Sequence, residues 1–263
     1  MSFQPLLPST GIAGWNFLQA TYDKQFEVFT QDAVLQRESD YFLENIGNVK
    51  SAADLISDPR LLDVALGAFG LEEDSYKKAF LERILQEGTE ADDALANRMD
   101  DARYVQLSDA FGFGPGQSLK TGDLQAMTEL VSANQVQAFE TAVGEQDPAM
   151  RTAMFAEREL AAVAGDDTSV DTQWFNVMAQ PALREMFELS LNLPSSIGQI
   201  DIDQQLTAFK DRANAVFGSD DLSGFSDPEQ MDKLITRYLA MSEISQFDSS
   251  ISSGSTALLL LQG

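Results

Sequence analysis

Residues 59–71, PRLLDVALGAFGL, align without a gap on residues 181–193, PALREMFELSLNL. Both stretches begin with proline and carry apolar residues at the spacing of one helix face. Proline favours the first position of a helix because its missing N–H would have no partner there. The pair of stretches therefore predicts a helix that occurs twice in this chain.

The similarity extends on both sides of these two stretches. Downstream, AFLER at 79–83 matches AFKDR at 208–212 after a short insertion, and Arg37-Glu38 upstream matches Arg158-Glu159. Because the matched order spans several helical segments, we expect two copies of a helical unit. Two copies indicate a pseudo-symmetric bundle rather than a solenoid, which generally needs three or more units. Chance similarity between amphipathic helices is the alternative.

Helical spacing of apolar residues continues along almost the whole chain, and Ile197–Ile202 is only a weak candidate for a strand. Three Asp-Pro pairs, Asp58-Pro59, Asp147-Pro148 and Asp227-Pro228, are typical helix starts in which the carboxylate caps free N–H groups. The predicted fold class is therefore all-α, a multi-helix bundle built from two similar helical repeats with little or no β structure.

We divide the chain from these patterns and from its Gly- and Ser-rich stretches. Residues 219–229 and 248–256 are rich in Ser, Asp and Gly, which favours a linker and a loose tail. The expected segments are an N-terminal helical segment, repeat 1, a Gly-rich linker with a helix start, repeat 2, and a C-terminal helix with a flexible tail: 1–35, 36–114, 115–132, 133–218 and 219–263.

The charge balance is strongly acidic, with 42 Asp and Glu against 17 Lys and Arg and a formal net charge of −25. Such a field repels phosphate backbones and anionic lipids, so we expect neither nucleic-acid binding nor membrane insertion. It favours a protein partner with a basic surface. An organism with an acidic, halotolerant proteome would explain the charge equally well.

The chain contains no Cys and no His. Thiolate nucleophiles, disulfides and the usual structural zinc sites need Cys, and His is the commonest general base and metal ligand near neutral pH. Carboxylates, Lys, Tyr and hydroxyls remain, which leaves an enzyme as a minor alternative. We therefore predict a protein that is not an enzyme, with no catalytic residue, no cofactor and no metal ligand.

Three motifs resemble chemical signatures without fulfilling them. Ser75–Lys78 fits S-x-x-K and Lys120–Gly122 reads KTG, but the chain has no Ser-Asp-Asn and no credible strand at Lys120. The GFGPG run at 112–116 lacks the spacing of a phosphate loop, so we interpret it as a flexible loop between repeats that could serve as a partner-binding hinge. Tandem acids such as Asp220-Asp221 lack the alternation of an EF-hand loop.

Two terminal groups of residues are candidates for partner binding. Trp15 and Phe17 offer aromatic anchors, with burial in the core of the first helix as the alternative. The consecutive leucines at the other end must be covered by this protein or by another. These four are Leu258, Leu259, Leu260 and Leu261.

Arginines recur at related places in the two copies although basic residues are scarce. On helices such side chains usually form ion pairs within the chain. The sharper hypothesis is that they fix the repeats against each other. These structural candidates are Arg60, Arg83, Arg184 and Arg212.

The N-terminal stretch does not have the features of a signal peptide, because Met1–Thr10 lacks positive charge and Gly11–Leu18 is too short for an apolar core. No run approaches the ~20 apolar residues that span a bilayer. We expect a cytoplasmic or flagellar location, reached without a cleaved signal.

Longer motifs resemble a known bacterial family. They are GIAGWNFLQATYDKQ from Gly11, SAADLISDPRLLDVALGAFGL from Ser51, AFLERILQE from Ala79 and YVQLSDAFGFG from Tyr104. In these the chain is similar to domain-of-unknown-function family 1217. The resemblance implies an all-helical protein whose genes lie beside flagellar genes in alphaproteobacteria, and it carries over no catalytic residue.

The resemblance and the composition together give the expected function. It is a non-catalytic, flagellum-associated structural or assembly protein that acts through protein–protein contacts. The alternative is a cytoplasmic export chaperone or regulator that binds one protein partner. The leucine tail is a departure from axial flagellar proteins, which pair long apolar heptads at both ends.

Overall fold

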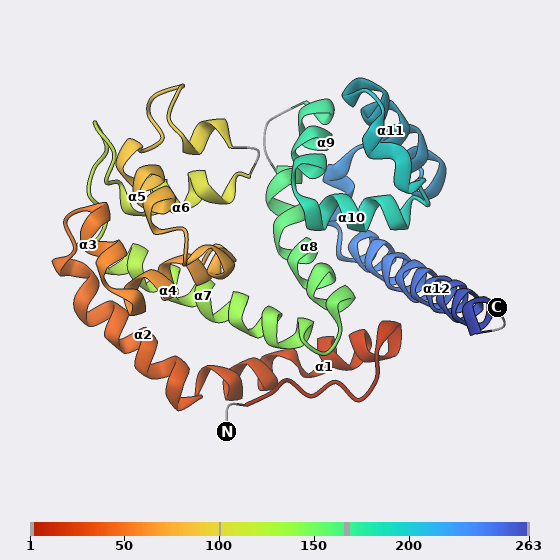
Figure 1. The fold of residues 1–263 in the computed structure, drawn as a ribbon, viewed down its shortest axis with the longest axis horizontal. Helices are drawn as coiled ribbons and strands as arrows, with labels where there is room; N and C mark the ends of the chain where they lie inside the picture. The colour runs from red at the N-terminus through yellow and green to blue at the C-terminus, as the bar shows by residue number, and fades with distance from the viewer. Residues whose placement is uncertain (1–2, 100, 166–168, 262–263) are drawn as a thin grey trace. The chain divides into compact units, whose positions relative to one another are not determined.

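The computed structural model describes residues 3–99, 101–165 and 169–261, and side chains within helices are described except at 161, 162, 164, 165 and 248–261. Over the described residues the chain forms twelve α-helices, five short 3-10 helices and no strand. The all-α prediction is confirmed. The chain divides into two compact units (Figure 1). Unit 1 comprises Met1–Leu6 and Thr21–Ala142, and unit 2 comprises Leu7–Ala20 and Val143–Gly263.

Two helices cross the division between the units. α1 (Gly11–Thr30) begins in unit 2 and continues into unit 1, and α7 (Leu124–Gly144) lies in unit 1 except for its last residues. The remaining helices of unit 1 are α2 (Ala33–Asn45), α3 (Ala52–Ser57), α4 (Pro59–Gly67), α5 (Lys78–Glu87) and α6 (Arg103–Phe111). Those of unit 2 are α8 (Pro148–Gly165), α9 (Val170–Ala179), α10 (Pro181–Ser190), α11 (Ile202–Phe217) and α12 (Pro228–Leu261).

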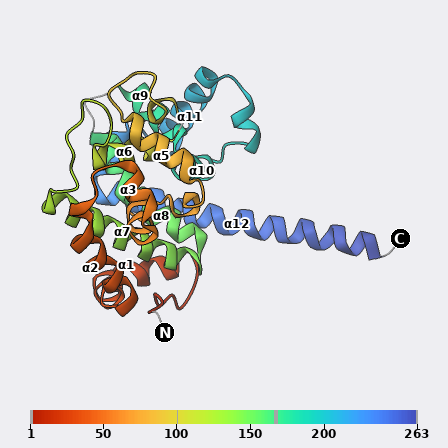
Figure 2. The same ribbon diagram turned by 60° about the vertical axis from the view of Figure 1, so that its left-hand side comes forward.

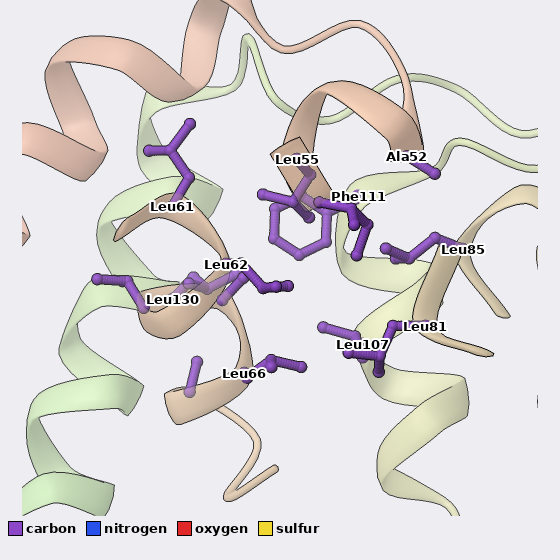
Figure 3. Close-up of a cluster of buried hydrophobic side chains, with 14 of the residues drawn as sticks. Ala52, Leu55, Leu61, Leu62, Leu66, Leu81, Leu85, Leu107, Phe111 and Leu130 are labelled. Atoms are coloured by element: carbon purple, nitrogen blue, oxygen red, sulfur yellow. The ribbon is translucent and has the colours of Figure 1, made fainter. Parts of the chain in front are cut away.

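The core of unit 1 gathers aliphatic side chains around Phe111 (Figure 3). Leu62 and Leu66 project from α4 toward Leu81 of α5 and Leu107 of α6, and all four are buried. Their spacing of four residues on α4 places both leucines on one face of that helix. The stretch that decides the fold therefore supplies the centre of this core.

Aromatic rings dominate the core of unit 2. Trp174 of α9 packs edge-on against Phe187 of α10, with ring centroids 5.0 Å apart, and lies 5.8 Å from Phe209 of α11. Its indole N–H donates to the carbonyl of Asp220 at 2.7 Å, which satisfies the polar atom of a buried ring. Phe225, in a short 3-10 helix at Leu222–Ser226, completes the cluster against Phe187.

The two units repeat one packing scheme. In unit 1, α4 packs on α2 and α3, and α3 packs on α5. In unit 2, α10 packs on α8 and α9, and α9 packs on α11. The helices α2 to α5 of unit 1 therefore pack on each other in the same pattern as α8 to α11 of unit 2. The gapless alignment of 59–71 on 181–193 predicts this equivalence.

The ends of α4 and α10 agree in atomic detail. Gly70 and Asn192, which the alignment pairs, both have left-handed backbones, with φ of 64° and 51°. Among described residues other than glycine, Asn192 alone has a positive φ. The next residues, Leu71 and Leu193, each donate an N–H five residues back, to Leu66 and to Glu188. This 6→1 bond is the Schellman ending, which accepts Gly most readily and Asn next.

The starts of the two helices differ in their caps. Asp58 caps α4 by accepting from the N–H groups of Arg60 and Leu61, whereas Gln180 before α10 makes no side-chain cap. The backbones are nearly the same, with φ and ψ of −103° and 105° at Asp58 and −100° and 111° at Gln180. The cap position of α10 is therefore shaped for a carboxylate that the sequence does not provide.

Gln180→Asp is expected to stabilise the protein by about 0.5–1 kcal/mol, because the new carboxylate meets free N–H groups in a backbone that already has cap geometry. The reciprocal change, Asp58→Gln, should destabilise by about 1 kcal/mol on the same reasoning. Urea unfolding followed by far-UV circular dichroism measures both. A destabilised Gln180→Asp variant would contradict the equivalence of the two helix starts.

The Gly-rich loop and the Ser-rich segments, which were expected to be loose, are packed or helical in the structure. The Gly-rich loop is docked within unit 1, where Thr121 donates its buried hydroxyl to the Val49 carbonyl at 2.8 Å. Gln117 of the same loop donates to the Thr89 hydroxyl at 2.7 Å. Where a linker and a loose tail were expected, the 219–229 region contains the buried Leu222 and Phe225, and α12 runs without interruption to Leu261 (Figure 2).

Candidate protein-binding surface

Trp15 is a core residue in unit 2. Only 2% of its surface is exposed, and Phe17 is half-buried. The neighbouring Gly14 explains how the helix approaches so closely, because a Cβ there would lie 2.0 Å from the Ser9 carbonyl oxygen and 2.4 Å from the Met150 methyl. Of the two interpretations of Trp15, a partner-binding anchor and a residue packed in the core, the structure therefore shows packing in the core.

The side chains of the four leucines at 258–261 lie outside the described residues. The helix that carries them, α12, is described as backbone to Leu261. The hypothesis that these leucines bind a partner stays a prediction.

The candidate arginines of unit 1 form bonds inside that unit. Arg60 of α4 pairs with Glu38 of α2 at 2.6 Å and stacks over the Tyr41 ring, 3.7 Å from its centroid. Arg83 pairs with Glu87 one turn later on α5 at 2.5 Å. Both pairs are partly exposed, so each contributes little to stability by itself.

The candidate arginines of unit 2 join α10 to α11. Arg184 donates to Glu188 on its own helix and to Gln205 of α11, both at 2.7 Å. Arg212 of α11 reaches back to the Leu191 carbonyl at the end of α10, at 2.8 and 3.0 Å. Arg184 therefore forms an ion pair inside its own unit, whereas Arg212 bonds a neutral carbonyl of the same unit.

A hydrogen-bonded carboxylate stands at the start of α4. Tyr41 donates its hydroxyl to Asp58 at 2.6 Å. Burial by itself would raise the pKa of Asp58, but the hydrogen bonds from Tyr41 and from the N–H groups of Leu61 and Arg60 outweigh it and hold that pKa below its usual value. The arrangement therefore favours the charged form.

Tyr41→Phe should destabilise the protein at pH 7, and the loss should shrink in acid. Because the pKa of Asp58 is lower in the folded protein, its charged form stabilises the fold at pH values above the unfolded-state pKa of about 4. This contribution is lost as the pH falls through the folded-state pKa. The variant loses the hydrogen bond to the charged carboxylate, so its loss of unfolding free energy should appear in the same pH range. Urea midpoints of both proteins at pH 7 and below pH 4 test this. An equal deficit at both pH values would contradict the role of the charge.

An open groove lies in unit 2 between the end of α11 and one face of α12. Its volume is about 650 Å³. Val216 and Phe217 form the α11 side. The residues from α12 are Gln230, Asp232, Lys233, Thr236, Arg237, Ala240 and Met241.

Two cations lie in this groove. Arg237 is half-buried and donates through Nε to the Ser190 carbonyl at 2.5 Å. Within the described residues no carboxylate oxygen lies within 4 Å of its guanidinium. Lys233 pairs with the exposed Glu229 at 2.9 Å, one turn earlier on the same helix. The guanidinium is thus held in place by a neutral carbonyl and keeps its charge for another partner.

Apolar side chains continue along the same face of α12 beyond the groove, beside the exposed Glu243. Burial on this helix ends at Ser242, and the following described residues to Phe247 are exposed. Ile244 and Phe247 have 55% and 66% of their surfaces exposed. They follow Arg237, Ala240 and Met241 at steps of three and four residues, so they continue the stripe that lines the groove.

Sequence reasoning missed this surface for a definite reason. The stripe of α12 that the periodicity reveals contains Leu234, Ile235, Tyr238 and Leu239, and these are buried. The residues of α12 that line the groove lie between these positions in the sequence, and they include cations as well as apolar residues. A signal was nevertheless present, because Ile244 and Phe247 do not fit the buried stripe.

Two further observations concern the described part of the chain. No helix there combines the length and the apolar content that a membrane span needs. The described acidic side chains also form no group of three or more that could hold a metal ion.

Comparison with known families places the chain. The model of the family described as "Protein of unknown function (DUF1217)" matches residues 68–231, which is more than half of the sequence. The chain belongs to this family. The DUF1217 match begins at the end of α4 and reaches the first turn of α12, so it includes parts of both units.

A solved structure is similar to this DUF1217 protein over nearly its whole length. It is the crystal structure of protein AGR_C_984 from Agrobacterium tumefaciens, with a TM-score of 0.73 and 26% sequence identity. The similarity covers 92% of this chain and 99% of that chain. No curated protein matches the sequence.

Proposed function

We propose that this DUF1217 protein is a non-catalytic, flagellum-associated structural or assembly protein. The observation that carries the proposal is membership in the family. The resemblance noted in the sequence implies that genes of this family lie beside flagellar genes in alphaproteobacteria. That gene neighbourhood in the family supports a flagellar role, and the groove on α12 supports an action through protein contacts.

The means is contact with another protein. The groove between α11 and α12 combines apolar side chains with two cations, and the exposed Ile244 and Phe247 extend it. Apolar side chains beside an arginine are the composition of binding hot spots. The composition of the chain points the same way, because without His and Cys the commonest catalytic groups are missing.

Location and swimming test the proposal together. We expect deletion of the gene to impair swimming, and the protein to appear in purified hook–basal bodies or in the medium, dependent on flagellar export. Fractions from an export-deficient strain are the control. Strict retention in the cytoplasm, with one partner co-purified, would support an export chaperone or regulator. Normal flagella and swimming in the deletion strain would overturn the proposal.

A further inference from the structure

The groove on α12 has the dimensions of a helix-binding site. From Gln230 to Phe247 the stripe runs along one face of a single helix. At a rise of ~1.5 Å per residue this face is about 26 Å long, which matches a partner helix of four to five turns. Val216 and Phe217 form a wall on one side, so a helix laid along α12 would contact two elements.

The chemistry of the groove changes along its length. Lys233 and Arg237 occupy the part near the start of α12, whereas Met241, Ile244 and Phe247 occupy the far part. An occupant must therefore offer carboxylates at one end and apolar side chains along the rest. Lys233 already pairs with Glu229, and Asp232, which also lines the groove, has no ion pair with Arg237 among the described residues. The guanidinium of Arg237 is therefore the cation that an occupant can reach.

We propose that this surface binds an acidic amphipathic helix of a partner protein. The apolar stripe of that helix packs on Met241 and Ile244, and a carboxylate at one end pairs with Arg237 and draws Lys233 away from Glu229. A guanidinium whose Nε–H donates to the Ser190 carbonyl is oriented in advance, so its terminal N–H groups can donate to a carboxylate without losing much freedom.

Charge argues against a second copy of this chain as the occupant. Each copy carries a net charge of −25, so self-association brings two strongly like-charged bodies together. A partner that is neutral or basic overall and carries a locally acidic helix avoids this repulsion and still matches Arg237. The inference rests on the proposed function only in that both require a protein partner.

Site-specific photocrosslinking in the native cell tests the occupant. We would replace Met241 or Ile244 with p-benzoylphenylalanine in the full chain and identify the crosslinked peptides by mass spectrometry. Tyr76, which is 76% exposed in unit 1, is the control position. We expect crosslinks from 241 and 244, and not from 76, to one amphipathic segment with acidic residues at one end. Crosslinks to a second copy, to a basic segment, or to nothing would overturn the proposal.

Charge variants test the electrostatic part. Lys233→Glu lies on an exposed side chain and should leave the fold intact, and Arg237→Gln removes the unmatched charge. We expect each to reduce crosslinking at 244 by about tenfold, as the loss of one close charge pair does. Lys24→Glu, also an exposed site, makes the same charge change in unit 1 and should have no effect. Undiminished crosslinking in both groove variants would overturn the role of the cations, provided that circular dichroism shows normal folding.

The outcomes separate this inference from the proposed function. A deletion strain that fails to swim, with no helix crosslinked at 241 or 244, would leave the flagellar proposal standing and remove the groove. A clear crosslink to an acidic helix, together with normal swimming of the deletion strain, would establish the groove and remove the flagellar proposal.

Discussion

Asp147→Asn should destabilise the protein by about 2 kcal/mol, although Asn caps helices as well as Asp does. The buried Asp147 uses both carboxylate oxygens. Oδ1 accepts from the N–H groups of Ala149 and Met150 at 3.0 and 3.2 Å, which caps α8. Oδ2 accepts from the N–H of Gly11 at 3.2 Å and so ties the start of α1 to α8 within unit 2.

The reason is the count of acceptors. An asparagine has one acceptor oxygen and one donor NH₂, so it can cap α8 only by turning its NH₂ toward the N–H of Gly11. A buried N–H then loses its partner, which costs about 1–3 kcal/mol. Asp147→Ala loses the cap as well and should cost more.

Asp227→Asn is the matched control. Asp227 also precedes a proline and caps α12 through the N–H of Glu229 at 3.0 Å, but it is exposed and has no second helix to hold. We expect a change of less than about 0.5 kcal/mol there. Urea unfolding measures both variants. Equal small losses at 147 and 227 would show that the bond to Gly11 contributes nothing.

Gly114→Ala should destabilise the protein by about 1–3 kcal/mol, because it forces two backbone segments of unit 1 apart. A Cβ on Gly114 would lie 2.4 Å from the Cα and 2.9 Å from the N of Gly88. Both contacts are backbone atoms, which cannot move aside as the end of a flexible side chain can. Gly88 is itself left-handed, with φ of 72°, and ends α5.

Gly122→Ala, in the same loop, is the control. No heavy atom outside its chain neighbours lies within 4 Å of a Cβ at that position, and its φ is not positive. The change should be neutral or slightly stabilising, since alanine restricts the unfolded chain. Thermal unfolding of both variants is the measurement. A stable Gly114→Ala variant would mean that the loop is not docked on Gly88.

The repeat shows which features of the fold can be predicted from the sequence. Helix spacing in 59–71 and 181–193 predicts two like helices, and the structure gives them equivalent packing and equivalent endings at Gly70 and Asn192. The candidate surface was not predictable to the same degree. Arg237 and Met241 are ordinary residues of a helix until α11 is placed beside them.

The sequence by itself determined what depends on neighbours along the chain: the all-α class, the Asp-Pro helix starts and the duplicated unit. These follow from spacing and from caps, whose partners lie within a few residues. Only the tertiary structure decided that Trp15 is buried, that the Gly-rich loop is docked on Gly88, and that one face of α12 stays open. Such features depend on which distant segments approach each other, and no local pattern records that approach.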